Sequence, residues 1–298
     1  MKQLGQNINH LNEFATRADQ EGILEYSAKF PNNELGEISQ HIIQIYNRLM
    51  KAKGDLVIEQ KRVLKEQEQQ ALIKKQLTQN ISHELKTPVS SIQGYLETIL
   101  TNKDLSSDTV YGFVQKSYTQ CNRLSSLLYD ISNLTKIEEA PEMFVKETVD
   151  LSEIISSVVG DVHLLLSEKN INVILKTEGK KMECLGNPSL LYSIFRNLID
   201  NTIGYAGKDI SIEVECYQED AMYCYFRYFD TGIGVNEEHL PRLFERFYRV
   251  DKGRSRKSGG TGLGLAVVKN ALMLHGGTIS AKKHEPSGLE FEFTIKKS

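Results

Sequence analysis

Long apolar stretches, paired cysteines and a surplus of one charge are all missing from this 298-residue sequence. No apolar run approaches the roughly 18 residues that a membrane helix needs, and the amino terminus lacks the pattern of a signal peptide. The four cysteines show no Cys-x-x-Cys spacing, which argues against a zinc ribbon or a disulfide scaffold and predicts reduced thiols. A net charge of -3 argues against a nucleic-acid binder that relies on bulk electrostatics.

Glycine is scarce in the first half of the chain and concentrated in the second. Residues 1–140 hold 6 of the 21 glycines, and nine others lie between Gly232 and Gly277. Because glycine is unfavourable inside helices and useful where the backbone turns sharply or approaches a ligand, the first half should be helical. The second half should be a globular domain with a glycine-lined site.

Two short amphipathic helices are predicted within residues 1–52. The apolar positions Leu4, Ile8, Leu11 and Phe14 form one stripe, and Leu35, Ile38, Ile42, Ile45 and Leu49 form another. Such helices bury their stripes most simply in a parallel dimer of four helices. The region resembles a HAMP domain, a signal-relay bundle that follows a membrane span, although a plain coiled-coil dimeriser has the same kind of stripe.

A helical hairpin is predicted for residues 53–140. A long helix should cover residues 57–100, and a turn should follow at residues 101–107. A second helix, capped by Ser107 or Asp108, should reach about residue 138. Its broad apolar faces favour dimerisation into a four-helix bundle.

The first helix of the hairpin carries His83 in the string Ser-His-Glu-Leu-Lys-Thr-Pro, residues 82–88. His83 lies about 200° around the helix from Ile81, so it should face solvent, and Pro88 should bend the helix just after it. An exposed imidazole can attack phosphorus, Glu84 could hold or deprotonate it, and the Thr87 hydroxyl, one turn on, could orient a water. A lone exposed histidine is otherwise an ordinary surface residue. The string closely resembles the phosphoacceptor box of sensor histidine kinases.

Residues 141–298 mix helices and strands. Strands are predicted at 143–148, 171–177, 210–216, 223–230, 278–283 and 289–295. Helices are predicted near 151–169, from about 188 to 205, and from the glycine-rich segment 259–265 to about 275. This order favours a two-layer α/β sandwich.

Three local patterns in this domain suggest chemistry. Asn197 and Asn201 stack on one helical face, and amide oxygens suit Mg²⁺, although surface asparagines look the same. Asp230 precedes Thr-Gly-Ile-Gly, where a carboxylate could accept a hydrogen bond from an exocyclic amine, although an ordinary turn also fits. Residues 259–265, Gly-Gly-Thr-Gly-Leu-Gly-Leu, open a helix whose amino terminus could bind an anion, but they match neither a Rossmann turn nor a Walker loop.

Together with Leu-Phe-Glu-Arg-Phe-Tyr-Arg at 243–249, and in this order, these patterns resemble the four boxes of the histidine-kinase ATP-binding domain. The resemblance implies a Bergerat-type fold, with ATP and Mg²⁺ as ligands. The residues that it assigns to ATP are Asn197, Asn201, Tyr205, Asp230, Gly232, Gly234, Lys252, Gly260, Thr261, Gly262, Leu263 and Gly264. Of these, Asn197 and Asn201 would bind Mg²⁺, and Asp230 would accept a hydrogen bond from the adenine amine. Gly232 and Gly234 would lie against the base, and the glycines from 260 to 264 would lie at the phosphates.

Residues 249–257 would form a mobile lid with five basic side chains against one acid, suited to a triphosphate, although a solvated loop has the same composition. The family usually has a basic residue before the aromatic that ends its first box, whereas Gly204 precedes Tyr205 here. We expect Arg249 or another lid residue to take its place.

The expected function is that of a dimeric, ATP-dependent histidine kinase that phosphorylates His83 and passes the phosphoryl group to an aspartate of a response regulator. The catalytic residues would be His83, Glu84, Thr87 and Arg249, and phosphatase activity is a second expectation. Two alternatives stay open: an ATPase of the chaperone or DNA-repair type, and a dimeric scaffold that no longer turns over ATP. The resemblance also predicts the cytoplasmic portion of a receptor in a bacterial inner membrane, with spans upstream of Met1, and no nucleic-acid partner.

Overall fold

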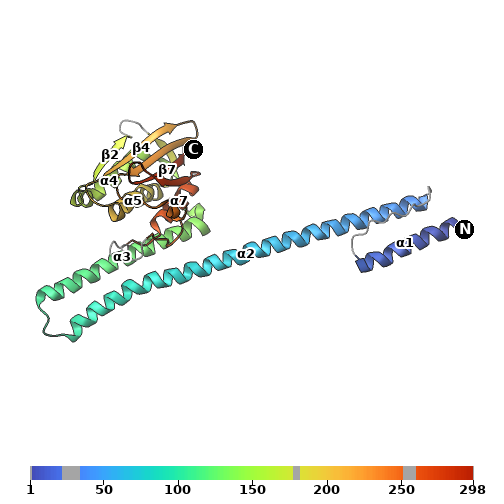
Figure 1. The fold of residues 1–298 in the computed structure, drawn as a ribbon, viewed down its shortest axis with the longest axis horizontal. Helices are drawn as coiled ribbons and strands as arrows, with labels where there is room; N and C mark the ends of the chain where they lie inside the picture. Colours follow the sequence, from blue (N-terminus) through green and yellow to red (C-terminus); the bar gives the residue numbers. More distant parts are fainter. Residues whose placement is uncertain (1, 22–33, 177–181, 251–259, 298) are drawn as a thin grey trace. The chain divides into compact units, whose positions relative to one another are not determined.

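The computed structural model describes residues 2–21, 34–176, 182–250 and 260–297. The chain divides into two compact units, Met1–Thr78 and Gln79–Ser298. Figure 1 shows the helical half in blue and green and the sheet-containing domain in yellow to red. Within the described ranges, no helix combines the length and the apolar character that a membrane crossing requires.

The first unit consists of α1 (Lys2–Glu21) and the beginning of α2 (Glu34–Thr101). The Phe14 and Tyr46 rings meet edge to face, with centroids 5.3 Å apart, and Phe14 and Ile43 are buried. Most of the predicted second stripe remains exposed in the single chain: Ile38, Ile42, Ile45 and Leu49. The predicted dimer would cover these side chains.

Helix α2 is continuous where the sequence suggested two helices. It passes through residues 50–56 and the predicted domain boundary at 52, because the helix-favouring Lys51, Ala52 and Lys53 outweigh a single Gly54. It also continues through Pro88, which is buried.

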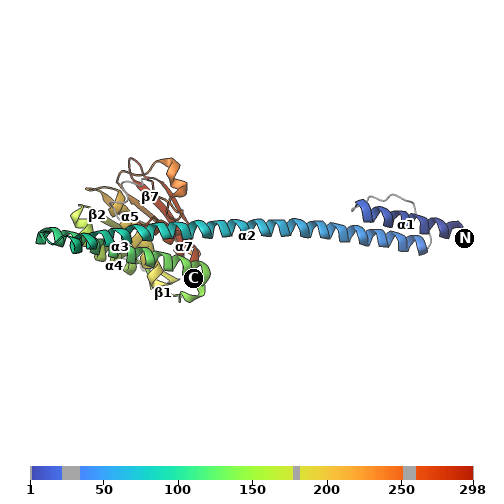
Figure 2. The same cartoon turned by 90° about the horizontal axis from the view of Figure 1, so that it is seen from below.

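The second unit begins with the hairpin formed by the end of α2 and by α3 (Ser107–Glu139), which run in opposite directions (Figure 1, Figure 2). The cap of α3 is Ser106, where Ser107 or Asp108 was predicted, and its Oγ accepts the Thr109 N–H at 3.3 Å. The Tyr95 and Phe113 rings stack across the hairpin at 5.6 Å. Several apolar side chains of the hairpin are exposed in the single chain, among them Val89, Leu96, Leu100, Val114 and Leu128.

The domain that follows is a two-layer α/β sandwich, as predicted. Its elements are η1 (Pro141–Met143), β1 (Glu147–Asp150), α4 (Leu151–Glu168), β2 (Asn172–Lys176), β3 (Glu183–Gly186), α5 (Pro188–Tyr205), β4 (Ser211–Glu219), β5 (Tyr223–Asp230), η2 (Glu237–Arg242), α7 (Gly264–Leu274), β6 (Ile279–Lys283) and β7 (Leu289–Lys296). Five strands form a sheet in the order β2-β4-β5-β7-β6, in which only the β2–β4 pair is parallel. Helices α4, α5 and α7 cover one face of this sheet (Figure 1).

Strands β1 and β3 form a separate antiparallel pair. The sequence predicted β1 at 143–148, four residues early, and did not predict β3. The pairing joins residues more than thirty positions apart, so a local pattern carries little signal for it.

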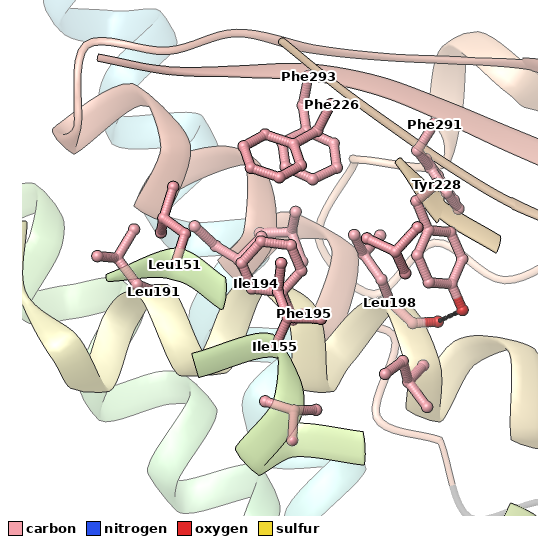
Figure 3. Packing of buried hydrophobic residues seen from close by; sticks show 14 of the residues in the cluster. Leu151, Ile155, Leu191, Ile194, Phe195, Leu198, Phe226, Tyr228, Phe291 and Phe293 are labelled. Carbon is pink, nitrogen blue, oxygen red and sulfur yellow. Dashed lines mark hydrogen bonds between the residues drawn. The ribbon is translucent and has the colours of Figure 1, made fainter. Parts of the chain in front are cut away.

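The core lies between the helices and the sheet. Every second residue of β5 is buried, as a strand with one covered face requires. The Phe226 and Phe293 rings stack at 5.2 Å, and Phe195 of α5 meets both rings edge to face (Figure 3).

Two contacts position α5 and α7, the helices that carry the predicted ligands. Asn187 caps α5, as expected, by accepting the Leu190 N–H at 3.1 Å. The buried His275, which ends α7, accepts the Asn187 N–H at 2.9 Å through Nε2, so its Nδ1–H donates to the Ala271 carbonyl at 2.7 Å. Burial lowers the pKa of His275, which favours the neutral ring that this arrangement needs.

The domain also contacts α3 through the beginning of α7. Leu263, Ala266 and Val267 pack against Leu127 and Leu134 of α3 in a small buried cluster of their own. This cluster lies directly beside the glycine-rich segment.

Candidate functional site

A cavity of about 400 Å³ lies between α5, β5, the segment after η2 and the start of α7. Its lining combines polar side chains with apolar ones such as Ile233, Val235 and Leu265. Residues predicted from the sequence that line it are Asn197, Asn201, Tyr205, Asp230, Gly234, Arg249, Gly260, Thr261, Gly262 and Gly264. Motifs spread over more than sixty residues of sequence therefore meet at one cavity.

Two of the predicted residues do not line the cavity, and a third lies outside the described residues. Gly232 is not among the lining residues, and its N–H donates to Asp230 Oδ1 at 2.9 Å. Leu263 is fully buried in the cluster against α3, so its side chain faces away from the cavity. Lys252 and most of the predicted lid lie outside the described residues.

The two asparagines lie one helical turn apart on α5, and both line the cavity. The Asn197 Nδ2 donates to the Ser193 carbonyl at 2.8 Å, which fixes the amide and leaves its oxygen for another partner. That oxygen faces Gly264, where an added Cβ would come within 2.6 Å of it. A side chain at 264 would therefore press on the amide oxygen and force it to shift.

Asp230 ends β5 and is only 2% exposed. Its carboxylate accepts the Gly232 N–H through Oδ1 and the Thr202 hydroxyl through Oδ2, the latter at 3.2 Å. Thr202 Oγ1 also lies 2.7 Å from the hydroxyl of the fully buried Tyr228. An ionised Asp230 can only accept hydrogen bonds, so the Thr202 hydroxyl uses its one hydrogen as a donor to Asp230. The Tyr228 hydroxyl must therefore donate to Thr202 or to the Leu198 carbonyl, 3.1 Å away.

Burial raises the pKa of Asp230, while the hydrogen bonds from Gly232 and Thr202 act in the opposite direction. These bonds leave part of the acceptor capacity of the carboxylate free at the cavity wall. The arrangement suits an N–H donor on a flat ring. Sequence reasoning found Asp230 but missed Thr202 and Tyr228, which are ordinary core positions in any local pattern.

The glycine-rich segment leads into the amino terminus of α7. Gly260, Thr261, Gly262 and Gly264 border the cavity, where the backbone N–H groups at the start of the helix and the helix dipole favour an anion. The Thr261 hydroxyl, however, donates to Asp130 Oδ2 of α3 at 3.1 Å. Burial raises the pKa of Asp130 to about 6, against the opposing effect of this hydrogen bond.

His83 is exposed on α2, as predicted. The Thr87 hydroxyl donates to the His83 carbonyl at 3.2 Å, so it lies on the same face one turn later. The Glu84 side chain turns instead toward two arginines: its Oε2 lies 3.2 Å from Arg123 Nη2 of α3 and 4.0 Å from Arg249 Nη1. Adjacent helical residues project about 100° apart, which explains why Glu84 and His83 face different partners.

Arg249 lines the cavity and also faces Glu84 of α2. Its side chain is only 10% exposed, and its Nε and Nη2 are buried with no hydrogen-bond acceptor among the residues that the structure describes. Such donors are costly to leave unpaired, and an anion in the cavity would supply acceptors. Gly204, the departure from the family pattern, has open space around it, and Tyr205 beside it contacts Gly260.

Two protein-family models match parts of this chain. A family model described as "His Kinase A (phospho-acceptor) domain" matches residues 73–140. A second, described as "Histidine kinase-, DNA gyrase B-, and HSP90-like ATPase", matches residues 186–298.

The phosphate regulon sensor protein PhoR of Pseudomonas aeruginosa is 36% identical over 203 residues, which are 68% of this chain and 45% of that protein. The chain thus spans about half the length of the curated relatives that it matches.

Two solved structures share the fold at low identity. The histidine kinase AdeS of Acinetobacter baumannii has a TM-score of 0.56 at 22% identity, over 72% of this chain and 98% of that one. The histidine kinase ThkA in complex with response regulator protein TrrA has a TM-score of 0.58 at 19% identity, over 75% of this chain and 61% of that one. With both family models matched in the order in which the sequence motifs occur, the chain belongs to the sensor histidine kinases.

Proposed function

We propose that this chain is an ATP-dependent protein-histidine kinase whose phosphoacceptor is His83. The observation that carries the proposal is the ion pair between Arg249, on the cavity wall, and Glu84, the residue that follows His83. It brings the nucleotide cavity and the phosphoacceptor helix into one neighbourhood. The match of the phospho-acceptor family model to residues 73–140 supports the same assignment.

The cavity would hold ATP with its base at Asp230 and its phosphates at the glycine-rich segment. Asp230 would accept the adenine amine, and Gly234, with φ of +66°, would bring the backbone close to the ring. The phosphates would meet the N–H groups at the start of α7 and the free donors of Arg249. Lys252 stays a predicted phosphate ligand from the lid.

The residues of the cavity fit Mg²⁺ bound together with phosphates. Asn197 and Asn201 offer two neutral oxygen ligands, and Mg²⁺ usually takes one or two protein ligands and completes its shell with water and phosphate. The ion would neutralise charge on the phosphate oxygens. The described residues contain no cluster of three or more histidines, cysteines or acids that would suggest a different metal centre.

The reaction transfers one phosphoryl group. A ring nitrogen of neutral His83 forms a bond to the γ-phosphorus, and the bond from that phosphorus to the bridging oxygen of ADP breaks. The proton on the other ring nitrogen passes to Glu84 or to water, and ADP leaves. A movement of the catalytic domain must align ATP with His83.

Radiolabelled ATP tests this proposal. The wild-type chain should acquire a label that is labile in acid and stable in base, and the H83Q variant should acquire none. The matched control is H163Q, since His163 is also an exposed helical histidine, on α4. Equal labelling of wild type and H83Q would overturn the proposal.

The expected partners are a second copy of the chain and a response regulator. The exposed apolar side chains of the hairpin would be covered in a homodimer. The likeness to ThkA, whose structure contains a response regulator protein, supports transfer of the phosphoryl group from His83 to such a protein. A location at the cytoplasmic side of a bacterial membrane stays a prediction.

Dephosphorylation of the regulator is a second candidate activity. The exposed Thr87 hydroxyl lies over the His83 carbonyl, where it retains acceptor capacity for a water molecule. T87A should slow dephosphorylation of a phosphorylated regulator, and T87S should retain it. Unchanged dephosphorylation by T87A would count against this activity.

A non-phosphorylating ATPase and an inactive scaffold are the alternatives. The phospho-acceptor family match disfavours the first, because a chaperone-like ATPase has no use for that helix. A nucleotide titration separates the second, since a scaffold without an ATP site would not bind.

A further inference from the structure

One carboxylate lies between two largely buried guanidinium groups. Glu84 Oε2 is 3.2 Å from Arg123, whose side chain is 12% exposed, and 4.0 Å from Arg249, which is 10% exposed. Arg123 belongs to α3 and does not line the cavity, whereas Arg249 does. Neither the phosphoryl transfer nor the ATP contacts described above make use of Arg123.

Two groups can therefore compete for Arg249. Its recorded ion-pair partner among the described residues is Glu84, and its Nε and Nη2 are buried without acceptors. A phosphate in the cavity would satisfy those donors but must also overcome the attraction between Arg249 and Glu84. The strength of that attraction depends on how far Arg123 already neutralises the Glu84 charge.

We propose that Arg123 is a positioning residue that controls nucleotide affinity through Glu84. By sharing the Glu84 carboxylate, Arg123 weakens its hold on Arg249 and leaves that guanidinium available to the terminal phosphate. When the phosphate takes Arg249, Arg123 still holds the Glu84 carboxylate on the hairpin. The inference rests on the proposed function, because it assumes that the cavity binds ATP.

This arrangement predicts opposite effects of two neutralising substitutions. E84Q frees Arg249 from its competitor, so ATP binding should strengthen. R123Q leaves the Glu84 charge to act on Arg249 alone, so ATP binding should weaken. For a partly buried ion pair, we expect the dissociation constant to change by about fivefold in each of the two variants. In the double variant Arg123 has no carboxylate through which to act, so its affinity should equal that of E84Q.

The measurement is the dissociation constant of an ATP analogue with a β,γ-imido bridge, by calorimetry on the full chain with Mg²⁺. R123K retains the positive charge and should restore the wild-type affinity. The matched control is R246Q, because Arg246 pairs with Glu138 of α3 and so also joins the domain to that helix, but does not line the cavity. Its affinity should stay within about twofold of the wild type.

The outcomes separate the two proposals. If the wild-type chain binds no nucleotide, the proposed function fails. If it binds and labels His83 but R123Q and E84Q shift the affinity in the same direction, or R246Q reproduces R123Q, the role of Arg123 is refuted. Should R123Q fail to fold, the comparison of E84Q with R123K and wild type decides, because E84Q must still bind more tightly.

Discussion

Replacing Asp230 by asparagine should weaken ATP binding without destabilising the protein. The substitution keeps the shape of the side chain and removes its charge. Asp230 is 2% exposed and is held by the Gly232 N–H and the Thr202 hydroxyl. The two effects can be separated because the ligand and the fold use different properties of this carboxylate.

The loss of affinity follows from the hydrogen bond to the base. A hydrogen bond to a charged group contributes about 1.5–3 kcal/mol, so the neutral amide should weaken ATP binding roughly 10- to 150-fold. Discrimination against GTP should fall as well, because guanine carries an acceptor where adenine carries its amine, and a carboxylate repels it.

The fold should tolerate the change because the hydrogen-bond chain can reverse. The new amide oxygen can keep the Gly232 N–H, and its NH₂ can donate to Thr202. The Thr202 hydroxyl then donates to Tyr228, which donates to the Leu198 carbonyl. Since burial raises the pKa of Asp230, the ionised form already carries a desolvation cost that the amide avoids.

Calorimetric titration with ATP and with GTP, and thermal unfolding of the nucleotide-free chain, measure the two effects. D161N is the matched control, since Asp161 is an exposed carboxylate of α4 that does not line the cavity and accepts a hydrogen bond from the Tyr192 hydroxyl. The reasoning fails if D230N binds ATP within threefold of the wild type, or if its unfolding temperature falls by more than that of D161N.

Three further predictions concern the glycine-rich segment and two titrating groups. G264A places a Cβ within 2.6 Å of Asn197 Oδ1, so nucleotide affinity should fall at least about threefold, and more with Mg²⁺ than with a chelator present, in equilibrium titrations. Because burial lowers the pKa of His275, its contribution to stability is present above about pH 6.5 and is lost as the pH falls. Denaturant unfolding between pH 5 and 8 should show this loss, and H275Q should make the free energy of unfolding less dependent on pH. Asp130 has a raised pKa of about 6, so its contribution is present below its unfolded value of 3.8 and is lost as the pH rises through 6; D130N should remove that loss.

Elements with strong local signals could be predicted to the residue. Helix α5 begins and ends where the sequence placed it, because Asn187 caps it and Pro188 fills its first turn. Strand β5 likewise has the predicted bounds. The long α2 could not be predicted as one helix, since Gly54 and the change of stripe look like a boundary while the chain around them still favours helix.

The residues of the candidate site likewise fall into those that the sequence could predict and those that it could not. The motif residues could be predicted because each motif is a short string, and ten of them do line one cavity. Their partners could not, because Arg123, Asp130, Thr202 and Tyr228 become significant only through contacts with residues far away in sequence. The partners of Glu84 could not be predicted either, since Arg123 and Arg249 come from distant segments, and its role beside His83 stays a prediction.

The segment from Gly260 to Leu265 has two surfaces with different partners. One surface borders the cavity, and the other holds Leu263 in the cluster with Leu127 and Leu134 of α3, beside the Thr261–Asp130 hydrogen bond. A ligand that changes the geometry of this segment therefore changes its fit to α3. Because coupling between two binding events is reciprocal, contact with α3 must alter nucleotide affinity by the same factor by which the nucleotide alters that contact. A kinase whose domain must leave α3 to reach His83 can thus use nucleotide binding itself to favour the movement.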